Sequence, residues 1–148
     1  MKTRPEDHIL ILDFGAQYTQ LISRKVRELG VYSEIKPFTI SSREIQNLRP
    51  KGLILSGGPE SVYEKDAPLA DKNIFGLGIP ILGICYGLQV VAHFYGGQVG
   101  GSQKREYGLA ELKIDNPGAL FKGLKPTTQV WMSHGDALND LPPGFAPL

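Results

Sequence analysis

Residues 83–89 have the sequence GICYGLQ and contain the single cysteine of the chain, Cys85. Before them, residues 78–82 (GIPIL) predict a short buried strand, and after them residues 88–95 (LQVVAHFY) predict a helix closed by the glycines at 96–97. A nucleophile between two glycines at a sharp strand-to-helix turn is typical of a nucleophile elbow, here with cysteine in place of serine. At a helix N-terminus the dipole and the free amides favour a thiolate. The alternative interpretation of a lone cysteine is a small buried apolar residue.

Upstream of this turn, the sequence alternates between strand and helix patterns. Consecutive apolar residues predict strands buried on both faces, and apolar residues at helical spacing predict an amphipathic helix. The predicted strands are at residues 8–13, 31–35 and 52–56, and the predicted helices are at residues 18–29 and in a short segment through Leu48 capped by Ser41 or Ser42. This order predicts an α/β protein with an open, mostly parallel, twisted sheet and helices on both faces.

The helix at residues 18–29 has Leu21, Ile22, Val26 and Leu29 on one face. Gly30 follows it as a helix-terminating residue. Residues 62–73 are polar and predict a loop, in which Pro68 opens a possible short helix.

Downstream of the helix at residues 88–95, the character of the sequence changes. Residues 98–103 are rich in glycine and predict a flexible segment, whereas residues 107–115 alternate between apolar and polar side chains. Such alternation is typical of a half-exposed antiparallel or edge strand. A turn at residues 116–118 and a strand at residues 128–132 complete a predicted small antiparallel part.

The length of 148 residues and the apolar content indicate at most one domain, which we place at residues 8–148 after an N-terminal extension at residues 1–7. The net charge is +1 and no basic stripe is present, so nothing in the sequence indicates nucleic-acid binding. A single cysteine excludes an internal disulfide and suits a reducing compartment. No apolar run approaches the roughly 20 residues that span a bilayer. We therefore expect a cytoplasmic protein that does not enter a membrane.

Three segments at predicted strand ends carry chemical groups, namely residues 57–59, residues 85–86 and residues 133–136. A thiolate that attacks an amide or ester carbonyl needs backbone donors directed at the developing oxyanion. The amide of Tyr86 is the natural first donor, and an amide of the Gly57-Gly58 loop is the natural second, because glycine permits close approach of the backbone.

The nucleophile also needs a general base, and the chain has three histidines as candidates. His8 begins the first strand, at the end opposite the predicted site. His93 is about 12 Å from Cys85 along the predicted helix, and it should point elsewhere. His134 lies in a suitable loop with Asp136 as a nearby acid, but its alternative role is to shape a pocket. One cysteine and three scattered histidines give no metal-ligand cluster.

Taken together, three segments resemble the class I (triad) glutamine amidotransferase family: residues 83–89, residues 56–61 (SGGPES) and residues 131–136 (WMSHGD). More narrowly, residues 11–22 (ILDFGAQYTQLI) are similar to the start of those family members that serve the amination of XMP to GMP. The resemblance covers nearly the whole chain from His8 onward. It implies a flavodoxin-like open α/β sheet with a small antiparallel part.

The resemblance also implies roles for individual residues. Cys85 is expected to attack the side-chain amide of L-glutamine and to form a glutamyl thioester with release of ammonia. The backbone amides of Gly58 and Tyr86 are expected to bind the oxyanion. The residues expected to bind glutamine are Gly57, Gln89, Ser133, His134, Gly135 and Asp136. No cofactor or metal is expected in this domain. Its expected partner, in cis or as a separate subunit, is a domain that uses ATP and Mg²⁺ to aminate XMP to GMP.

The sequence departs from the family pattern at the catalytic base. In the family the base and its orienting acid form a His-x-Glu motif, and no His-x-Glu occurs in these 148 residues. We therefore expect the domain to be incomplete at its C-terminus and this polypeptide by itself to be inactive. Two alternatives to the enzymatic function are an inactive glutamine-binding or docking fragment and a different cysteine triad hydrolase on the same scaffold.

Overall fold

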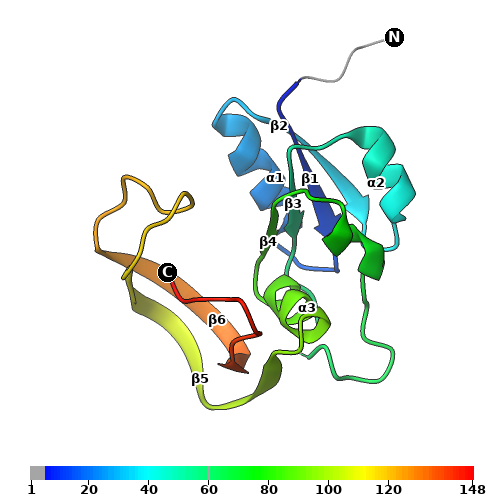
Figure 1. Ribbon diagram of the computed structural model, residues 1–148. Helices are drawn as coiled ribbons and strands as arrows, with labels where there is room; N and C mark the ends of the chain where they lie inside the picture. The colour runs from blue at the N-terminus through cyan, green and yellow to red at the C-terminus, as the bar shows by residue number, and fades with distance from the viewer. Residues whose placement is uncertain (1–5, 60) are drawn as a thin grey trace.

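The computed structural model describes residues 6–59 and 61–148, apart from the side chains of residues 101–106 and 134–136. Helices and strands alternate in its first part, and two long strands follow (Figure 1). The elements in chain order are β1 (His8–Asp13), α1 (Thr19–Glu28), β2 (Tyr32–Pro37), α2 (Ser42–Leu48), β3 (Gly52–Leu55), the 3-10 helix η1 (Lys72–Gly76), β4 (Ile81–Gly83), α3 (Tyr86–Phe94), β5 (Gln98–Lys113) and β6 (Thr127–Asp140). No helix of the described residues is long and apolar enough to cross a membrane.

The first four strands form a parallel sheet in the order β2-β1-β3-β4. In its centre Leu10 of β1 pairs with Leu53 of β3, and Leu12 pairs with Leu55. All four leucine side chains are buried on one face of the sheet, and Ile11 is fully buried on the other, as expected for strands covered on both faces. The predicted open parallel α/β sheet is therefore confirmed.

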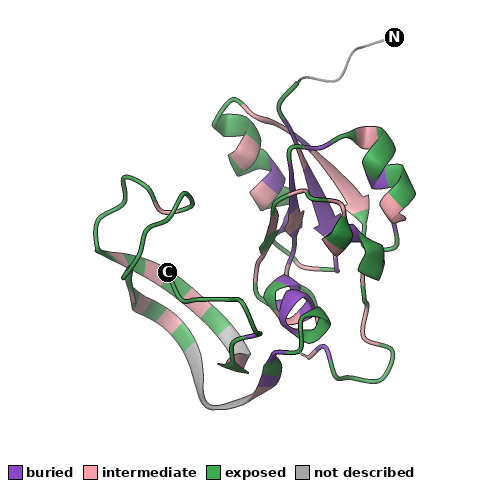
Figure 2. Cartoon of the chain, viewed as in Figure 1, coloured by how far each residue is buried: buried purple, intermediate pink, exposed green. Residues whose placement is uncertain are grey.

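Helices cover both faces of this sheet. On one face, the central leucines form a core with Ile45 of α2, Ile74 of η1 and Val90 of α3. On the opposite face α1 packs along β1 and β2 (Figure 1). Figure 2 shows buried residues concentrated in the sheet and in α3.

The residues that α1 buries differ from its apolar stripe. Thr19 and Ser23 are its buried residues, and the hydroxyls of Ser23 and Ser33 of β2 lie 2.9 Å apart. Leu21 is 43% exposed and Leu29 is 84% exposed. The helical spacing of apolar residues predicted the position of α1 correctly. It did not predict that the hydroxyl contact between Ser23 and Ser33 would determine which side of α1 faces β2.

The last two strands form a separate two-stranded antiparallel sheet, which we call the ribbon (residues 98–113 and 127–140). The predicted antiparallel part is confirmed, but two local predictions are wrong. Residues 98–103, expected to be flexible, belong to β5, and residues 133–136, expected in a loop, belong to β6. Main-chain hydrogen bonds between strands do not require particular side chains, so pairing overrides the weak strand propensity of the glycines.

Two boundaries on the chain also differ from the sequence-based expectation. The short helix expected from Pro68 begins at Lys72 instead, because the carboxylate of Asp71 accepts a hydrogen bond from the backbone N–H of Asn73 at 2.9 Å. The helix after Cys85 begins at Tyr86 rather than at Leu88. By contrast, α2 is capped by one of the two predicted serines, Ser41, in a reciprocal capping box with Glu44.

Asp71 links η1 to the start of α2, which makes stability depend on pH. Its carboxylate accepts hydrogen bonds from the backbone N–H groups of Ser42, at 2.8 Å, and Asn73, and these bonds lower the pKa of Asp71 to about 2. We expect Asp71→Ala to lower the free energy of unfolding by about 1 kcal/mol at pH 7. Because the folded pKa lies below the unfolded value of about 3.9, this contribution is present above pH 4 and lost as the pH falls toward 2.

Urea denaturation of both proteins at pH 7, 5 and 3 measures the effect of Asp71. The matched control is Asp115→Ala, since that carboxylate is exposed and lies 3.7 Å from the Nζ of Lys113, also exposed. A difference between wild type and Asp71→Ala that stays constant from pH 7 to pH 3 would contradict the role given to its ionised carboxylate.

Candidate active site

Cys85 lies between β4 and α3 and occupies the N-cap position of α3. Its backbone has φ 50° and ψ −112°, a conformation that non-glycine residues rarely adopt. Its side chain is exposed. The predicted strand-turn-helix geometry is therefore confirmed, and the alternative of a buried apolar cysteine does not hold.

The two glycines that flank Cys85 permit the sharp turn. A Cβ atom on Gly83 would lie 2.7 Å from the backbone of Gly87 and Leu88. A Cβ atom on Gly87 would lie 2.6 Å from the carbonyl carbon of Leu55 and 2.7 Å from its Cβ. Real side chains do not tolerate such separations, so the glycines allow α3 to start directly against β3.

The Gly57-Gly58 loop lies beside the cysteine. A Cβ atom on Gly57 would lie 3.8 Å from the Cβ of Cys85, and one on Gly58 would lie 2.9 Å from both the Cβ of Phe14 and the Cδ1 of Tyr86. The structure thus brings together the first two of the three predicted segments. The loop after β1 joins them through Phe14, whose ring centroid is 5.6 Å from that of Tyr86.

Ser56 connects these loops, although it was not among the residues predicted for the site. It is fully buried, and its hydroxyl accepts a hydrogen bond from the backbone N–H of Phe14 at 3.0 Å and donates one to the carbonyl oxygen of Gly57 at 2.8 Å. The sequence signal that could have identified Ser56 is its position directly after an apolar strand and before a glycine pair. Its partner Phe14 is 42 residues away in sequence, so the contact itself was not predictable.

Side chains of α3 hold the segment that follows the glycine loop. The side-chain oxygen of Gln89 accepts a hydrogen bond from the backbone N–H of Val62 at 3.0 Å. The hydroxyl of Tyr86 donates to the carbonyl oxygen of Pro68 at 2.8 Å. Burial, with a smaller contribution from the negative charge of Glu64, raises the pKa of Tyr86. Gln89 thus has a structural contact in addition to its expected role in glutamine binding.

The histidines occupy three different settings. His8 is buried beside Glu34, with 3.7 Å between its Nε2 and a carboxylate oxygen. His93 packs edge-on against Tyr63, with ring centroids 5.6 Å apart. The side chain of His134 lies outside the described residues.

The third predicted segment is located in the ribbon. Ser133 is exposed and pairs with Tyr107 across the two strands, so it does not stand at the end of a parallel strand. The side chains of residues 134–136 are not described, and the roles expected for Gly135 and Asp136 stay predictions. No group of His, Cys, Asp or Glu that could hold a metal ion occurs among the described residues.

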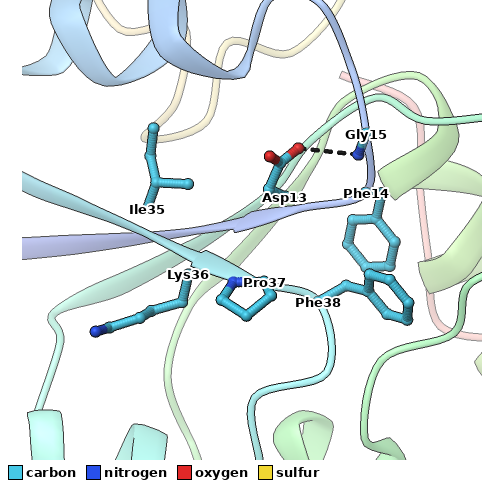
Figure 3. A pocket seen from close by; sticks show the side chains of 7 residues that line it. All are labelled: Asp13, Phe14, Gly15, Ile35, Lys36, Pro37 and Phe38. Carbon is cyan, nitrogen blue, oxygen red and sulfur yellow. Dashed lines mark hydrogen bonds between the residues drawn. The ribbon is translucent and has the colours of Figure 1, made fainter.

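A cavity of about 480 Å³ lies at the carboxyl ends of β1 and β2 (Figure 3). Phe14 and Phe38 stack on one side of it, with ring centroids 5.5 Å apart. Asp13 is fixed at the start of the next loop, because its Oδ1 accepts hydrogen bonds from the N–H of Gly15 and the hydroxyl of Thr19, each at 2.9 Å. Cys85 does not line this cavity, but Phe14, which does, also contacts Tyr86 of the candidate active site.

Comparison with known families identifies the class of protein that this fold and site define. The family described as glutamine amidotransferase class-I matches residues 10–148. The chain belongs to the class I glutamine amidotransferase family.

Within that family, the chain is similar to the amidotransferase region of GMP synthases. It is 56% identical over 139 residues to the glutamine-hydrolysing GMP synthase of Brachyspira hyodysenteriae, covering 94% of this chain and 27% of that protein. It is 53% identical over 140 residues to the enzyme of Listeria innocua, covering 95% of this chain and 27% of that protein. The chain thus spans about a quarter of the length of these relatives.

Two solved structures share the fold. A Thermoplasma acidophilum protein, described as a candidate component of a GMP synthase, superposes with a TM-score of 0.84 at 32% identity, covering 95% of this chain and 71% of that one. A glutamine amidotransferase of Thermotoga maritima superposes with a TM-score of 0.71 at 22% identity, covering 95% of this chain and 65% of that one. The predicted α/β fold class is confirmed by these likenesses.

Proposed function

We propose that this chain hydrolyses the side-chain amide of glutamine as the amidotransferase part of a GMP synthase. The observation that carries the proposal is an exposed Cys85, with a positive φ of 50° at a helix N-terminus, beside the Gly57-Gly58 loop. The similarity to GMP synthases supports the choice of glutamine as substrate.

In the proposed reaction, the thiolate of Cys85 attacks the carbon of the side-chain amide. A C–S bond forms, and the backbone amides of Tyr86 and Gly58 bind the oxyanion. The C–N bond then breaks, and the leaving nitrogen takes a proton and departs as ammonia. Water hydrolyses the resulting glutamyl thioester to glutamate and regenerates the thiol.

We assign the recognition of glutamine to Gly57, Gln89 and the segment 133–136. The ammonia would pass to a domain that uses ATP and Mg²⁺ to aminate XMP to GMP. The names of the relatives support this partner, which lies in cis or on a separate polypeptide. No cofactor is assigned to the chain itself.

Labelling with a diazo-ketone analogue of glutamine tests the proposed function. We expect one adduct per chain, located on Cys85 by peptide mass spectrometry, and protection from labelling by millimolar glutamine. Iodoacetamide serves as the matched reagent, because it alkylates a reactive thiol without recognising glutamine. Equal labelling with and without glutamine would instead favour a different cysteine hydrolase on this scaffold.

The mechanism also needs a general base that accepts the proton of the Cys85 thiol, and we assign none of the described side chains to this role. Because the 148 residues contain no His-x-Glu, we expect this polypeptide, assayed by itself, to bind glutamine but to release ammonia at least ~100-fold more slowly than an intact amidotransferase. A coupled glutamate dehydrogenase assay measures the ammonia. Activity close to that of an intact enzyme would contradict this expectation and would make His134 the candidate base.

A further inference from the structure

We infer that Ser56 is a positioning residue that orients the oxyanion-binding amide of Gly58. The inference rests on the proposed function and concerns the same site. Ser56 directly follows β3 and continues its ladder, since its backbone N–H donates to the carbonyl oxygen of Leu12 at 3.1 Å. Its side chain is fully buried between two loops.

The direction of both hydrogen bonds of the Ser56 hydroxyl is fixed by chemistry. The backbone N–H of Phe14 can only donate, so the hydroxyl oxygen accepts this bond at 3.0 Å. The single hydroxyl proton is then free for the carbonyl oxygen of Gly57, which can only accept, at 2.8 Å. Ser56 therefore ties the Gly57 carbonyl to the backbone of the loop after β1.

That carbonyl belongs to the same peptide group as the N–H of Gly58. The group is planar and trans, as are all peptide bonds of the described residues, so its C=O and N–H point in opposite directions. Fixing the Gly57 carbonyl toward Ser56 consequently fixes the direction of the Gly58 N–H. Gly58 itself is closely surrounded, since a Cβ atom on it would lie 2.9 Å from Phe14 and from Tyr86.

The hydrogen bond from Ser56 to the Gly57 carbonyl matters because the peptide group that it holds joins two glycines, Gly57 and Gly58. Glycine populates both signs of φ with similar ease, so a Gly-Gly peptide plane can rotate at little cost. A rotated plane would present the carbonyl oxygen, rather than the N–H, to the developing negative charge. A preorganised donor acts in the transition state and contributes little to binding the neutral amide of the substrate.

Ser56→Ala in the intact protein tests this role. We expect the kcat of glutamine hydrolysis to fall by about 10- to 100-fold, with KM changed by less than about threefold. The rate of Cys85 alkylation by iodoacetamide should stay within about twofold, since displacement at a saturated carbon develops no oxyanion. The matched control is Ser33→Ala, which removes a buried hydroxyl that is hydrogen-bonded to α1 rather than to the loops of the site, and it should leave kcat unchanged.

Several outcomes overturn the inference. These are an unchanged kcat in Ser56→Ala, an equal fall in the rate of alkylation, and an equal loss of kcat in Ser33→Ala. If Ser56→Ala does not fold, Ser56→Cys keeps a similar volume and a weaker donor, and a kcat lowered about 3- to 10-fold supports the role whereas an unchanged kcat overturns it. An intact wild-type protein without glutaminase activity would refute the proposed function itself, which is a separate result.

Discussion

Gly87→Ala is expected to lower the free energy of unfolding by more than about 3 kcal/mol or to prevent folding. The added Cβ would lie within 2.7 Å of the main chain and Cβ of Leu55, which is fully buried in β3. Overpacking against movable side chains costs about 1–3 kcal/mol. Here the neighbour is the backbone of a central strand, so relief requires a shift of all of α3.

Gly76→Ala is the matched control for Gly87→Ala. Gly76 ends η1, and a Cβ atom on it would meet nothing within 4 Å. We expect its effect on the free energy of unfolding to stay within about 0.5 kcal/mol. Urea denaturation followed by circular dichroism compares the three proteins. Similar unfolding midpoints for Gly87→Ala and wild type would show that α3 does not depend on close approach to β3.

The core of the fold could be predicted because its signals are local. The apolar run at His8–Asp13 predicted β1 with its observed bounds, and the serine pair at 41–42 predicted the start of α2 to within one residue. Gly83 indicated the turn because a Cβ on it would meet the backbone of Gly87 and Leu88, which are only a few residues away in sequence. In each case, the residues whose pattern made the prediction are the same residues that form the predicted strand, cap or turn.

The remaining features depend on contacts between distant residues. The glycine-rich residues 98–101 form a strand because they pair with residues 136–140, and no local pattern reports that pairing. Gln89 was expected to face the substrate, but its contact with Val62 depends on the path of a loop without regular structure. The bond between Ser56 and Phe14 likewise joins two strand ends that only the parallel sheet brings together.

Replacing Cys85 is expected to separate activity from stability. Without its sulfur the proposed reaction has no nucleophile, and both Cys85→Ala and Cys85→Gly should lose glutaminase activity by about 10⁴-fold or more in the intact protein. Their stabilities should differ. The φ of 50° and ψ of −112° at this position cost a non-glycine residue about 1–3 kcal/mol, and glycine avoids this cost while losing about 0.5–1 kcal/mol through chain entropy.

Cys85→Gly should therefore have a free energy of unfolding about 1 kcal/mol higher than that of Cys85→Ala, as measured by urea denaturation. Cys85→Ala controls for the loss of the sulfur, because it retains a Cβ in the same backbone conformation. Equal stability of the two variants would mean that the turn holds cysteine without strain. Ammonia release by Cys85→Ala at the wild-type rate would exclude Cys85 as the nucleophile. Higher stability of the inactive glycine variant would instead show that the turn maintains an unfavourable conformation at the residue that performs the chemistry.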